Sequence, residues 1–236
     1  MRRCIVLRDA SSVEEEAVRR ILVAIADAAT SRDRCTLALA GGSTPVGIYA
    51  RLAVAPGVDW GRVHVYWGDE RAVPADSAEN NACMARNALL DHVPIPADQI
   101  HPMPSTAADL DAAARAYEDL LCAQLGRPPC LDLVLLGLGP DAHTASLFPG
   151  SPAVQERERY VVTTPAPAIA PRLTVTPPLL NAARALLLVA HGRSKARALH
   201  GVLHAAHDPL RFPPHALRHE TLTILVDRAA AGDIEA

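Results

Sequence analysis

Several features that mark particular classes of protein are missing from this sequence. Its 236 residues contain no apolar run close to the roughly 18 residues that a helix needs to cross a bilayer. The apolar run behind the basic N-terminus covers only residues 4–7, which is too short for a secretory signal. We therefore expect a cytoplasmic protein without a membrane partner.

The cysteine pattern of a disulfide-bonded or zinc-binding protein is also missing. There are five, an odd number, and no two of them stand in a C-x-x-C spacing. This pattern argues against a set of disulfides and against a zinc ribbon. We expect buried free thiols.

An excess of positive charge is also missing, because 23 Lys and Arg residues stand against 26 Asp and Glu residues, for a formal net charge of −3. A surface for nucleic acid or for an anionic membrane would need a basic stripe. Any anionic ligand must therefore be held by a local positive pocket. Lysine is nearly absent, since Lys195 is the only one. Either one lysine survives a strong arginine bias by chance, or this position requires a compact ammonium group that a planar guanidinium does not replace.

The composition and the order of apolar runs indicate the fold class. Half of the residues are hydrophobic and 21% are charged, as in an ordinary globular protein. Short β-branched runs alternate with helical stretches, which is typical of an α/β fold with a mostly parallel sheet and helices on both faces. We expect one domain spanning residues 1–236. The expected strands of this sheet are Cys4–Leu7, Thr36–Ala40, Val63–Trp67, Leu131–Leu136, Tyr160–Thr163, Leu173–Thr176, Ala185–Val189 and Leu222–Val226.

Helices are expected between these strands. The first should begin where Ser11 and Ser12 precede Glu14 and Glu15 as capping-box pairs, ahead of a helical repeat of apolar residues. The other expected helices are about Val46–Ala53, Ala78–Leu90, Ala107–Gln124, Ser194–Ala205 and Asp227–Ala231.

The second expected strand runs directly into Gly41-Gly42-Ser43-Thr44-Pro45. Pro45 suits the first position of a helix, which predicts Ser43 or Thr44 as the N-cap. Glycines let the backbone approach a ligand, and the positive helix end with its free N–H groups favours a phosphate. The G-x-x-x-x-G-K-[ST] spacing of a nucleotide P-loop is missing. The segment is either a phosphate site that includes Gly42, Ser43 and Thr44, or a tight turn without a ligand.

Charged residues follow the third expected strand. Gly68-Asp69-Glu70-Arg71 lies at its carboxyl end, where open α/β sheets bind ligands. Adjacent side chains tend to point to opposite sides, so one of the two carboxylates should face a substrate while the other holds Arg71. The alternative is a solvated charged loop.

A nearly continuous apolar strand opens into the glycine-rich loop GLGPDAHTAS at residues 137–146. The loop satisfies the G-x-G-x-x-G/A dinucleotide fingerprint, but a Pro-Gly pair would cut the following helix short, and the next strand has no acidic residue at its end. Asp141 stands two residues before His143. An imidazole can take a proton from water and return it at neutral pH, and a nearby carboxylate would fix its tautomer. His143 is therefore the candidate base, with Asp141 or Asp69 as its partner, unless it is a structural histidine.

Two cations follow later in the chain. Arg172 opens an expected strand, and Lys195 lies at the start of an expected helix. They can reach the same edge of the sheet only if the topology brings them there.

Ten histidines raise the question of a metal site. His200, His204 and His207 are spaced to share one helix face, but the H-E-x-x-H pattern is missing and a zinc site needs three or four converging ligands. We expect a solvated histidine-rich surface there and no metal.

Motifs spread over nearly the whole chain are similar, in type and in order, to those of 6-phosphogluconolactonases. They are Gly41-Gly42-Ser43-Thr44-Pro45, Trp67-Gly68-Asp69-Glu70-Arg71 with Val73-Pro74 and Asn81 after it, Val93-Pro94-Ile95-Pro96, the segment Asp132–Pro149, Arg172-Leu173-Thr174-Val175-Thr176, Asn181-Ala182-Ala183 and Gly192-x-x-Lys195. The wider superfamily also holds glucosamine-6-phosphate deaminases and ribose-5-phosphate isomerases.

The resemblance implies a Rossmann-like α/β fold, hydrolysis of 6-phosphogluconolactone to 6-phosphogluconate, and no cofactor. A small sugar-phosphate lactone would be the partner of a monomer or small homo-oligomer. The implied roles are His143 as the base that activates water, Asp69 and Arg71 at the lactone end, and Ser43, Thr44, Arg172 and Lys195 around the phosphate. One departure is Ala142, where the family usually has glycine. If that position needs positive φ, alanine costs roughly 1 kcal/mol there.

Two other functions stay open from the sequence. A deaminase or isomerase on the same scaffold would use Asp69 or Glu70 to move a proton between sugar carbons, although Arg71 and the residues after His143 resemble the lactonase branch. A non-catalytic sugar-phosphate sensor would usually carry a DNA-binding module, for which this chain has no spare residues and no basic helix.

Overall fold

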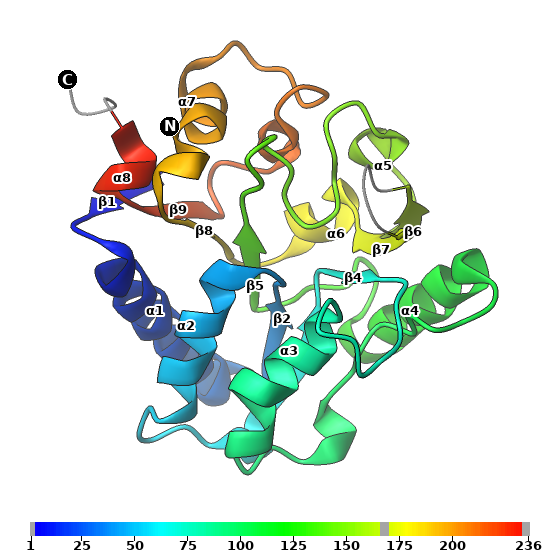
Figure 1. Ribbon diagram of the computed structural model, residues 1–236. Coiled ribbons are helices and arrows are strands. Elements are labelled where there is room, and N and C mark those ends of the chain that lie inside the picture. Colours follow the sequence, from blue (N-terminus) through cyan, green and yellow to red (C-terminus); the bar gives the residue numbers. More distant parts are fainter. Residues whose placement is uncertain (1–2, 166–169, 233–236) are drawn as a thin grey trace.

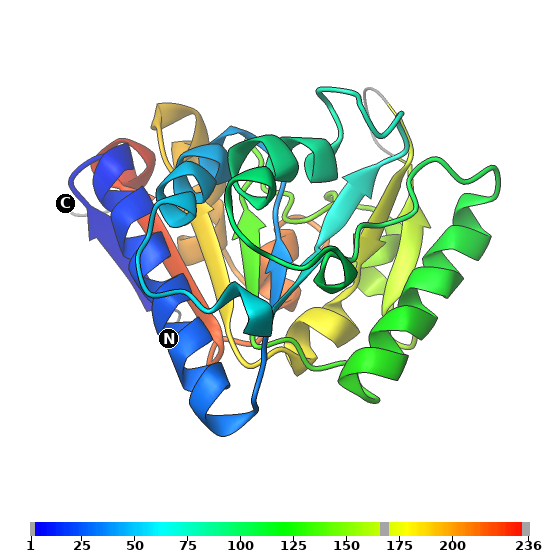
Figure 2. The same cartoon turned by 90° about the horizontal axis from the view of Figure 1, so that it is seen from below.

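The computed structural model describes residues 3–165 and 170–232 of the chain. Its main sheet consists of six strands that pair in parallel and run side by side in one direction (Figure 2). In spatial order they are β1 (Arg3–Leu7), β9 (Leu222–Asp227), β8 (Leu186–Ala190), β5 (Leu133–Gly137), β2 (Cys35–Leu39) and β3 (Val63–Trp67). The predicted parallel sheet is confirmed.

Helices cover both faces of this sheet, as the sequence predicts. α1 (Ala10–Ser31) and α2 (Ser43–Ala53) lie on one face, and α7 (Ala196–His204) lies on the other (Figure 1). Strands covered on both sides carry nearly continuous apolar runs, because neither face meets water. Accordingly, every residue of β2 and of β8 is buried.

A second sheet was not expected. β4 (Asp69–Arg71), β7 (Arg172–Val175) and β6 (Val161–Thr164) form three antiparallel strands in the spatial order β4-β7-β6. The sequence pattern predicts strands near the positions of β6 and β7 but assigns them to the main sheet, and that assignment is wrong. The connection between β6 and β7 is shorter than the dozen residues that a parallel crossover needs, whereas antiparallel neighbours can be joined by a short loop. α4 (Leu110–Leu125) packs along β6 (Figure 2).

The remaining elements are short. They are α3 (Asn81–Ala88), α5 (Pro152–Gln155), α6 (Pro177–Ala182), α8 (Arg228–Ala231) and the 3-10 turns Trp60–Arg62, Leu90–His92, Ala97–Gln99, η4 (Arg193–Lys195) and Pro213–Ala216. α3 begins three residues later than the sequence predicts, because the side chain of Asn80 caps it by accepting the backbone N–H of Cys83 at 2.8 Å.

The first helix also begins differently from the prediction. Its N-cap is Asp9, whose carboxylate accepts the backbone N–H of Ser12 at 2.9 Å, so the expected capping boxes at Ser11 and Ser12 do not form. A charged N-cap is favoured by the positive end of the helix dipole. The backbone hydrogen bond from Ser12 is the largest cause that lowers the pKa of Asp9 to about 2.

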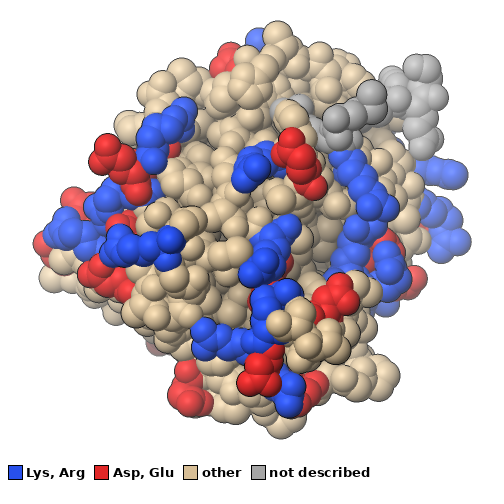
Figure 3. Space-filling view, turned by 180° about the vertical axis from the view of Figure 1, so that it is seen from behind, with Lys and Arg blue, Asp and Glu red and all other residues tan. Residues whose placement is uncertain are grey.

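No helix in the described ranges is long and apolar enough to cross a membrane. The face behind the view of Figure 1 carries side chains of both charge signs, interspersed (Figure 3). All five cysteines are free thiols, but only Cys35 is fully buried, so the prediction of buried thiols is wrong for the other four, which are partly exposed.

Candidate active site

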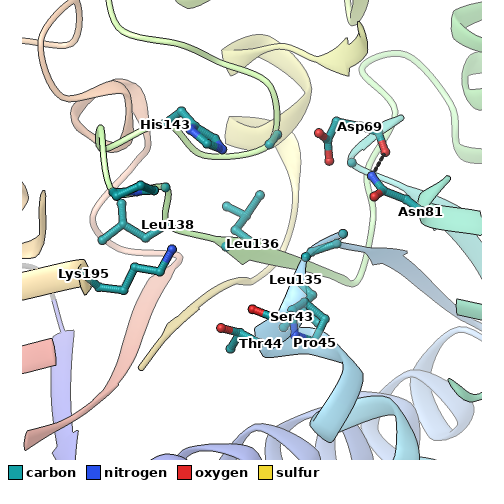
Figure 4. Close-up of a pocket in the computed structure, with 18 of the residues that line it drawn as sticks. Ser43, Thr44, Pro45, Asp69, Asn81, Leu135, Leu136, Leu138, His143 and Lys195 are labelled. Atoms are coloured by element: carbon teal, nitrogen blue, oxygen red, sulfur yellow. Dashed lines mark hydrogen bonds between the residues drawn. The ribbon is translucent and has the colours of Figure 1, made fainter. Parts of the chain in front are cut away.

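A cavity of about 200 Å³ lies at the carboxyl ends of the central parallel strands. The turn after β2, the start of β4, the loop after β5 and Lys195 contribute its walls (Figure 4). The lining residues are Ala40–Pro45, Gly68, Asp69, Arg71, Asn81, Leu135–Pro140, His143, Ala145 and Lys195. The edge at which the sequence predicts a site is therefore the edge at which the structure forms a cavity.

The turn between β2 and α2 brings a helix start to the cavity. The N-cap is Gly42, with φ of +95°, so Ser43 and Thr44 are the first two helical residues and Pro45 is the third. The prediction of Ser43 or Thr44 as N-cap is wrong, because an N-cap in this left-handed conformation favours glycine over a residue with a Cβ. The first-turn N–H groups of a helix have no partner within it, which leaves them free for an anion.

Tyr49 fixes the position of this turn. Its side chain is fully buried, and its hydroxyl donates to the carbonyl of Ala40 at 2.8 Å while accepting the N–H of Ala40 at 2.9 Å. Burial raises the pKa of Tyr49. One side chain of α2 thus holds the end of β2 against the helix that follows it.

Gly41 leaves room for the side chain of Asn81. A Cβ at this position would lie 2.0 Å from Oδ1 of Asn81, so only glycine lets that amide lie against the turn. The amide Nδ2 of Asn81 donates to the backbone carbonyl of Asp69 at 2.9 Å (Figure 4). Asn81 lines the cavity, although the sequence argument named it only as part of the resemblance.

Lys195 reaches the cavity from η4, on the side of Ser43 and Thr44 (Figure 4). Burial lowers the pKa of Lys195, and the charge of Asp141 opposes this shift. The two segments that the sequence associates with a phosphate therefore face one space.

The carboxylates of β4 point in different directions, as predicted. Glu70 is fully buried and accepts the backbone N–H groups of Arg71, Asn81 and Ala82 at 2.8 to 2.9 Å. Burial raises the pKa of Glu70 in spite of these hydrogen bonds. Glu70 therefore binds the backbone N–H of Arg71 and not the guanidinium of Arg71. Asp69, by contrast, lines the cavity.

The two arginines of the second sheet stand opposite each other. Arg71 lines the cavity and its Nη1 donates to the carbonyl of Glu79 at 2.5 Å. Arg172 pairs with Arg71 across β4 and β7 but is not among the residues that line the cavity. Burial, followed by the charge of Arg71, lowers the pKa of Arg172. The topology thus brings Arg172 near the site without placing it at the wall.

His143 is hydrogen-bonded to Asp141. Nδ1 of His143 lies 2.6 Å from Oδ1 of Asp141, and the same oxygen accepts the backbone N–H of His143 at 3.2 Å. The hydrogen bond to His143 is the largest cause that lowers the pKa of Asp141. A carboxylate at Nδ1 makes that nitrogen the donor and leaves Nε2 as the acceptor. Between the two partners that the sequence left open, the structure therefore selects Asp141.

The loop around His143 is tightly folded. Ala142 has φ of +74°, the positive value for which alanine is less suited than glycine. A Cβ on Gly139 would lie 2.1 Å from Nδ1 of His143, so the imidazole packs against bare backbone. The ring of Phe148 lies 4.9 Å from the imidazole, centroid to centroid.

The histidines near α7 lie apart from this cavity. α7 ends at His204, so the prediction that His207 shares a face of this helix is wrong. The ring of His207 stacks on the ring of His215, with 5.6 Å between the centroids. In the part of the chain that the structure describes, no three His, Cys, Asp or Glu side chains are placed to hold a metal ion.

Residues 8–225 match the family of glucosamine-6-phosphate isomerases and 6-phosphogluconolactonases. This chain belongs to that family. A 6-phosphogluconolactonase of Synechocystis sp. is 40% identical over 225 residues, which cover 93% of each chain. The 6-phosphogluconolactonase of Trypanosoma brucei has a similar structure, with a TM-score of 0.86 at 29% identity over 99% of each chain.

The fold of this glucosamine-6-phosphate isomerase/6-phosphogluconolactonase family also covers its other branch. A monomeric glucosamine-6-phosphate deaminase superposes with a TM-score of 0.84 at 24% identity, over 97% of this chain and 98% of its own. That similarity shows the fold alone. The Rossmann-like α/β class expected from the sequence is confirmed. The choice between the lactonase branch and the deaminase branch depends on the residues of the site.

Two residues that the structure places in or beside the site, Asn81 and Ser146, appear in the sequence analysis only within motifs and were given no role of their own. Ser146 is buried, and its hydroxyl donates to Oδ2 of Asp69 at 2.6 Å. For Asn81 a signal was present, because it follows the capping residue Asn80 at a helix start. For Ser146 there was none, since its partner is 77 residues away.

Proposed function

We propose that this chain hydrolyses 6-phosphogluconolactone to 6-phosphogluconate, as a cytoplasmic carboxylic ester hydrolase of the pentose phosphate pathway. The observation that carries the proposal is the Asp141–His143 pair, which faces a cavity whose other side holds the start of α2 and Lys195. A base on one side and an anion site on the other suit a sugar lactone with a distal phosphate. The 6-phosphogluconolactonases that resemble the chain over 93% or more of its length support this choice.

The phosphate is assigned to the positive side of the cavity. The backbone N–H groups at Ser43 and Thr44, together with the turn at Gly42, would bind its oxygens, and Lys195 would supply a cation. We assign Arg172 to the same anion-binding group, acting from its place beside Arg71. Holding the phosphate fixes the sugar, which converts attack on the lactone into a reaction between positioned groups.

His143 then supplies the chemistry. Nε2 of His143 takes a proton from a water molecule while the water oxygen attacks the lactone carbonyl carbon. Collapse of the tetrahedral intermediate breaks the bond to the ring oxygen, and the imidazolium returns the proton to that oxygen. Asp141 stays ionised and stabilises the imidazolium through Nδ1.

The oxyanion needs a donor in the same space. Arg71 lines the cavity, and its Nε is buried without a hydrogen-bond partner in the described structure. Backbone N–H groups of the loop 137–139 are the alternative, but the N–H of Gly139 already donates to the carbonyl of His143 at 2.8 Å. Arg71 is therefore the better candidate, with Asp69 beside it to accept a hydroxyl of the sugar.

We also propose the domain organisation, the oligomeric state and the partners of the protein. Residues 1–236 would act as one domain, as a monomer or small homo-oligomer, with a small sugar-phosphate lactone as partner. It would need neither a cofactor nor a metal ion, and it would bind neither nucleic acid nor membrane.

A coupled assay tests the reaction. Glucose-6-phosphate dehydrogenase generates 6-phosphogluconolactone in situ, and 6-phosphogluconate dehydrogenase reports the product. Wild type should exceed the enzyme-free blank with or without EDTA, and His143→Ala should lower kcat by about 10² to 10⁴, the usual contribution of a general base. Lys195→Met should raise KM for the phosphorylated lactone more than it lowers kcat.

Three outcomes would count against parts of this proposal. A wild-type rate equal to the blank would reject the lactonase, and glucosamine 6-phosphate and ribose 5-phosphate would be assayed next. Loss of activity in EDTA that added metal restores would reject the metal-free base. Full activity of His143→Ala would reject the assignment of the base.

A further inference from the structure

The hydrogen bond between Ser146 and Asp69 joins two parts of the site that are far apart in sequence. Oγ of Ser146 lies 2.6 Å from Oδ2 of Asp69. Ser146 is 1% exposed and Asp69 is 9% exposed, so little water reaches this contact. Hydrogen bonds from a hydroxyl to a carboxylate are short and strong, and in a buried place they fix the geometry of both groups.

Ser146 is itself held on the second sheet. Its backbone N–H donates to Oγ1 of Thr174 at 3.1 Å, and Thr174 on β7 pairs directly with Asp69 on β4. The hydroxyl of Thr174 donates in turn to the carbonyl of Val175 at 3.1 Å. Hydrogen bonds and strand pairing thus join three residues from three segments, Ser146, Thr174 and Asp69.

The loop is folded tightly to bring Ser146 to this place. Ala145 has φ of +48°, and the backbone N–H of Leu147 donates to the carbonyl of Thr144 at 3.0 Å, which closes a turn around Ser146. A non-glycine residue in this conformation is maintained only where the surrounding contacts fix it. The hydrogen bonds of Ser146 to Asp69 and Thr174 are among these contacts.

The contact decides which oxygen of Asp69 faces the cavity. Oδ2 accepts from Ser146, and the backbone carbonyl of Asp69 accepts from Asn81. Within the described ranges, Oδ1 has no recorded donor, while Asp69 lines the cavity. Oδ1 is the atom that remains to accept a hydroxyl of a sugar.

We propose that Ser146 is a positioning residue that orients the Asp69 carboxylate toward the substrate and fastens the His143 loop to the second sheet. The proposal rests on the proposed lactonase function. Because Ser146 follows His143 by three residues, one hydrogen bond sets the relative placement of the base and of the carboxylate. The phosphate end of the cavity, built from α2 and Lys195, is not touched by it.

Thr144→Val provides a matched control for Ser146→Ala. Thr144 lies in the same loop and is also fully buried, but its hydroxyl has no hydrogen-bond partner in the described structure. Ser146→Ala should lower kcat about 10- to 100-fold, the usual effect of losing a hydrogen bond to a charged group. Its KM should stay within about threefold, because the phosphate contacts remain. Thr144→Val should keep both parameters near wild type.

A double-mutant cycle separates positioning from general structural damage. If Ser146 acts through Asp69, then adding Ser146→Ala to Asp69→Ala should cost little beyond Asp69→Ala alone. If Ser146→Ala proves too unstable to assay, Ser146→Gly, which also removes the hydroxyl, gives the same comparison.

The possible results separate the positioning role of Ser146 from the lactonase function. An active Ser146→Ala with unchanged kcat, or effects of the two mutations that multiply in full, would overturn the positioning role while the lactonase stands. A raised KM with unchanged kcat would also overturn it. A wild type no faster than the blank would remove the proposed function and this role with it.

Discussion

Oδ1 of Asp141 lies 2.6 Å from Nδ1 of His143 and also accepts the backbone N–H of the same histidine at 3.2 Å. One carboxylate oxygen therefore fixes both the imidazole and the loop that carries it. This is the arrangement that a general base requires, because the nitrogen that takes the proton must have a defined direction.

Asp141→Asn should lower kcat about 10- to 100-fold, since a neutral amide stabilises the imidazolium less than a carboxylate does. The wild-type carboxylate stays ionised to a lower pH than an ordinary one, because its hydrogen bond to His143 lowers the pKa of Asp141. Its contribution should therefore be present above the ordinary carboxyl pKa and be lost only as the pH falls through the lowered one. Steady-state kinetics from pH 5 to 9, a range that lies above the ordinary carboxyl pKa, measure the drop in kcat, which should be the same size throughout. Asp76→Asn, at an exposed loop position, is the control and should leave kcat unchanged.

Gly139→Ala should cost activity rather than stability. The added Cβ would lie 2.1 Å from Nδ1 of His143 and 2.4 Å from Oδ1 of Asp141, so the imidazole must move. Misplacement by about 1 Å can cost on the order of 10²-fold in kcat. Gly137→Ala is the comparison, because a Cβ there meets nothing within 4 Å. Equal kcat values for the two variants would contradict the packing argument.

Ala142→Gly should stabilise the protein by about 1 kcal/mol, because φ of +74° strains alanine and suits glycine. Equilibrium unfolding in urea measures the change in free energy. Ala116→Gly, at an exposed position inside α4, should change stability by a similar amount in the opposite direction. Destabilisation by both substitutions would contradict the strain assigned to Ala142.

Tyr49→Phe should lower the free energy of unfolding by about 2 to 4 kcal/mol, since it leaves both backbone groups of Ala40 without their buried partner. KM should rise as well, because the phosphate turn follows directly. Tyr160→Phe, at a partly exposed position, should change stability by less than about 0.5 kcal/mol. A similar change in both variants would contradict the role assigned to the hydrogen bonds between Tyr49 and Ala40.

The His64–His101 pair should make the fold sensitive to acid. Nδ1 of His64 lies 3.3 Å from Nε2 of His101, and burial lowers the pKa of both. Arg34 acts in the same direction, whereas Asp98 opposes it. Because the unfolded chain takes up these protons first, stability should fall as the pH drops from the ordinary histidine pKa to the lowered values.

Urea midpoints at pH 7.5 and pH 5 measure this dependence. His101→Gln should reduce the difference between the two midpoints, whatever it does to the absolute stability. His204→Gln, on the exposed side of α7, should leave the difference as in wild type. An unchanged pH dependence in His101→Gln would assign the acid sensitivity to other groups.

The sequence by itself determined the parallel sheet and the location of the site. Buried strands such as β2 and β8 are recognisable because both faces must be apolar, and polar residues that directly follow them must lie at the carboxyl edge. His143, Asp69 and the Gly41–Thr44 turn follow strands in this way, and all of them line the cavity. Local chain geometry was sufficient for these predictions.

Only the tertiary structure decided which groups meet across the fold. The pairing of Ser146 with Asp69 and the approach of Asn81 to Gly41 depend on how distant segments pack, and they leave no periodic pattern in the sequence. Helix starts at Asp9 and Gly42 likewise depended on which neighbouring residue could take the required conformation. The second sheet is the largest example, because β7 pairs with β4, a strand far earlier in the chain, and no sequence pattern indicates that partner.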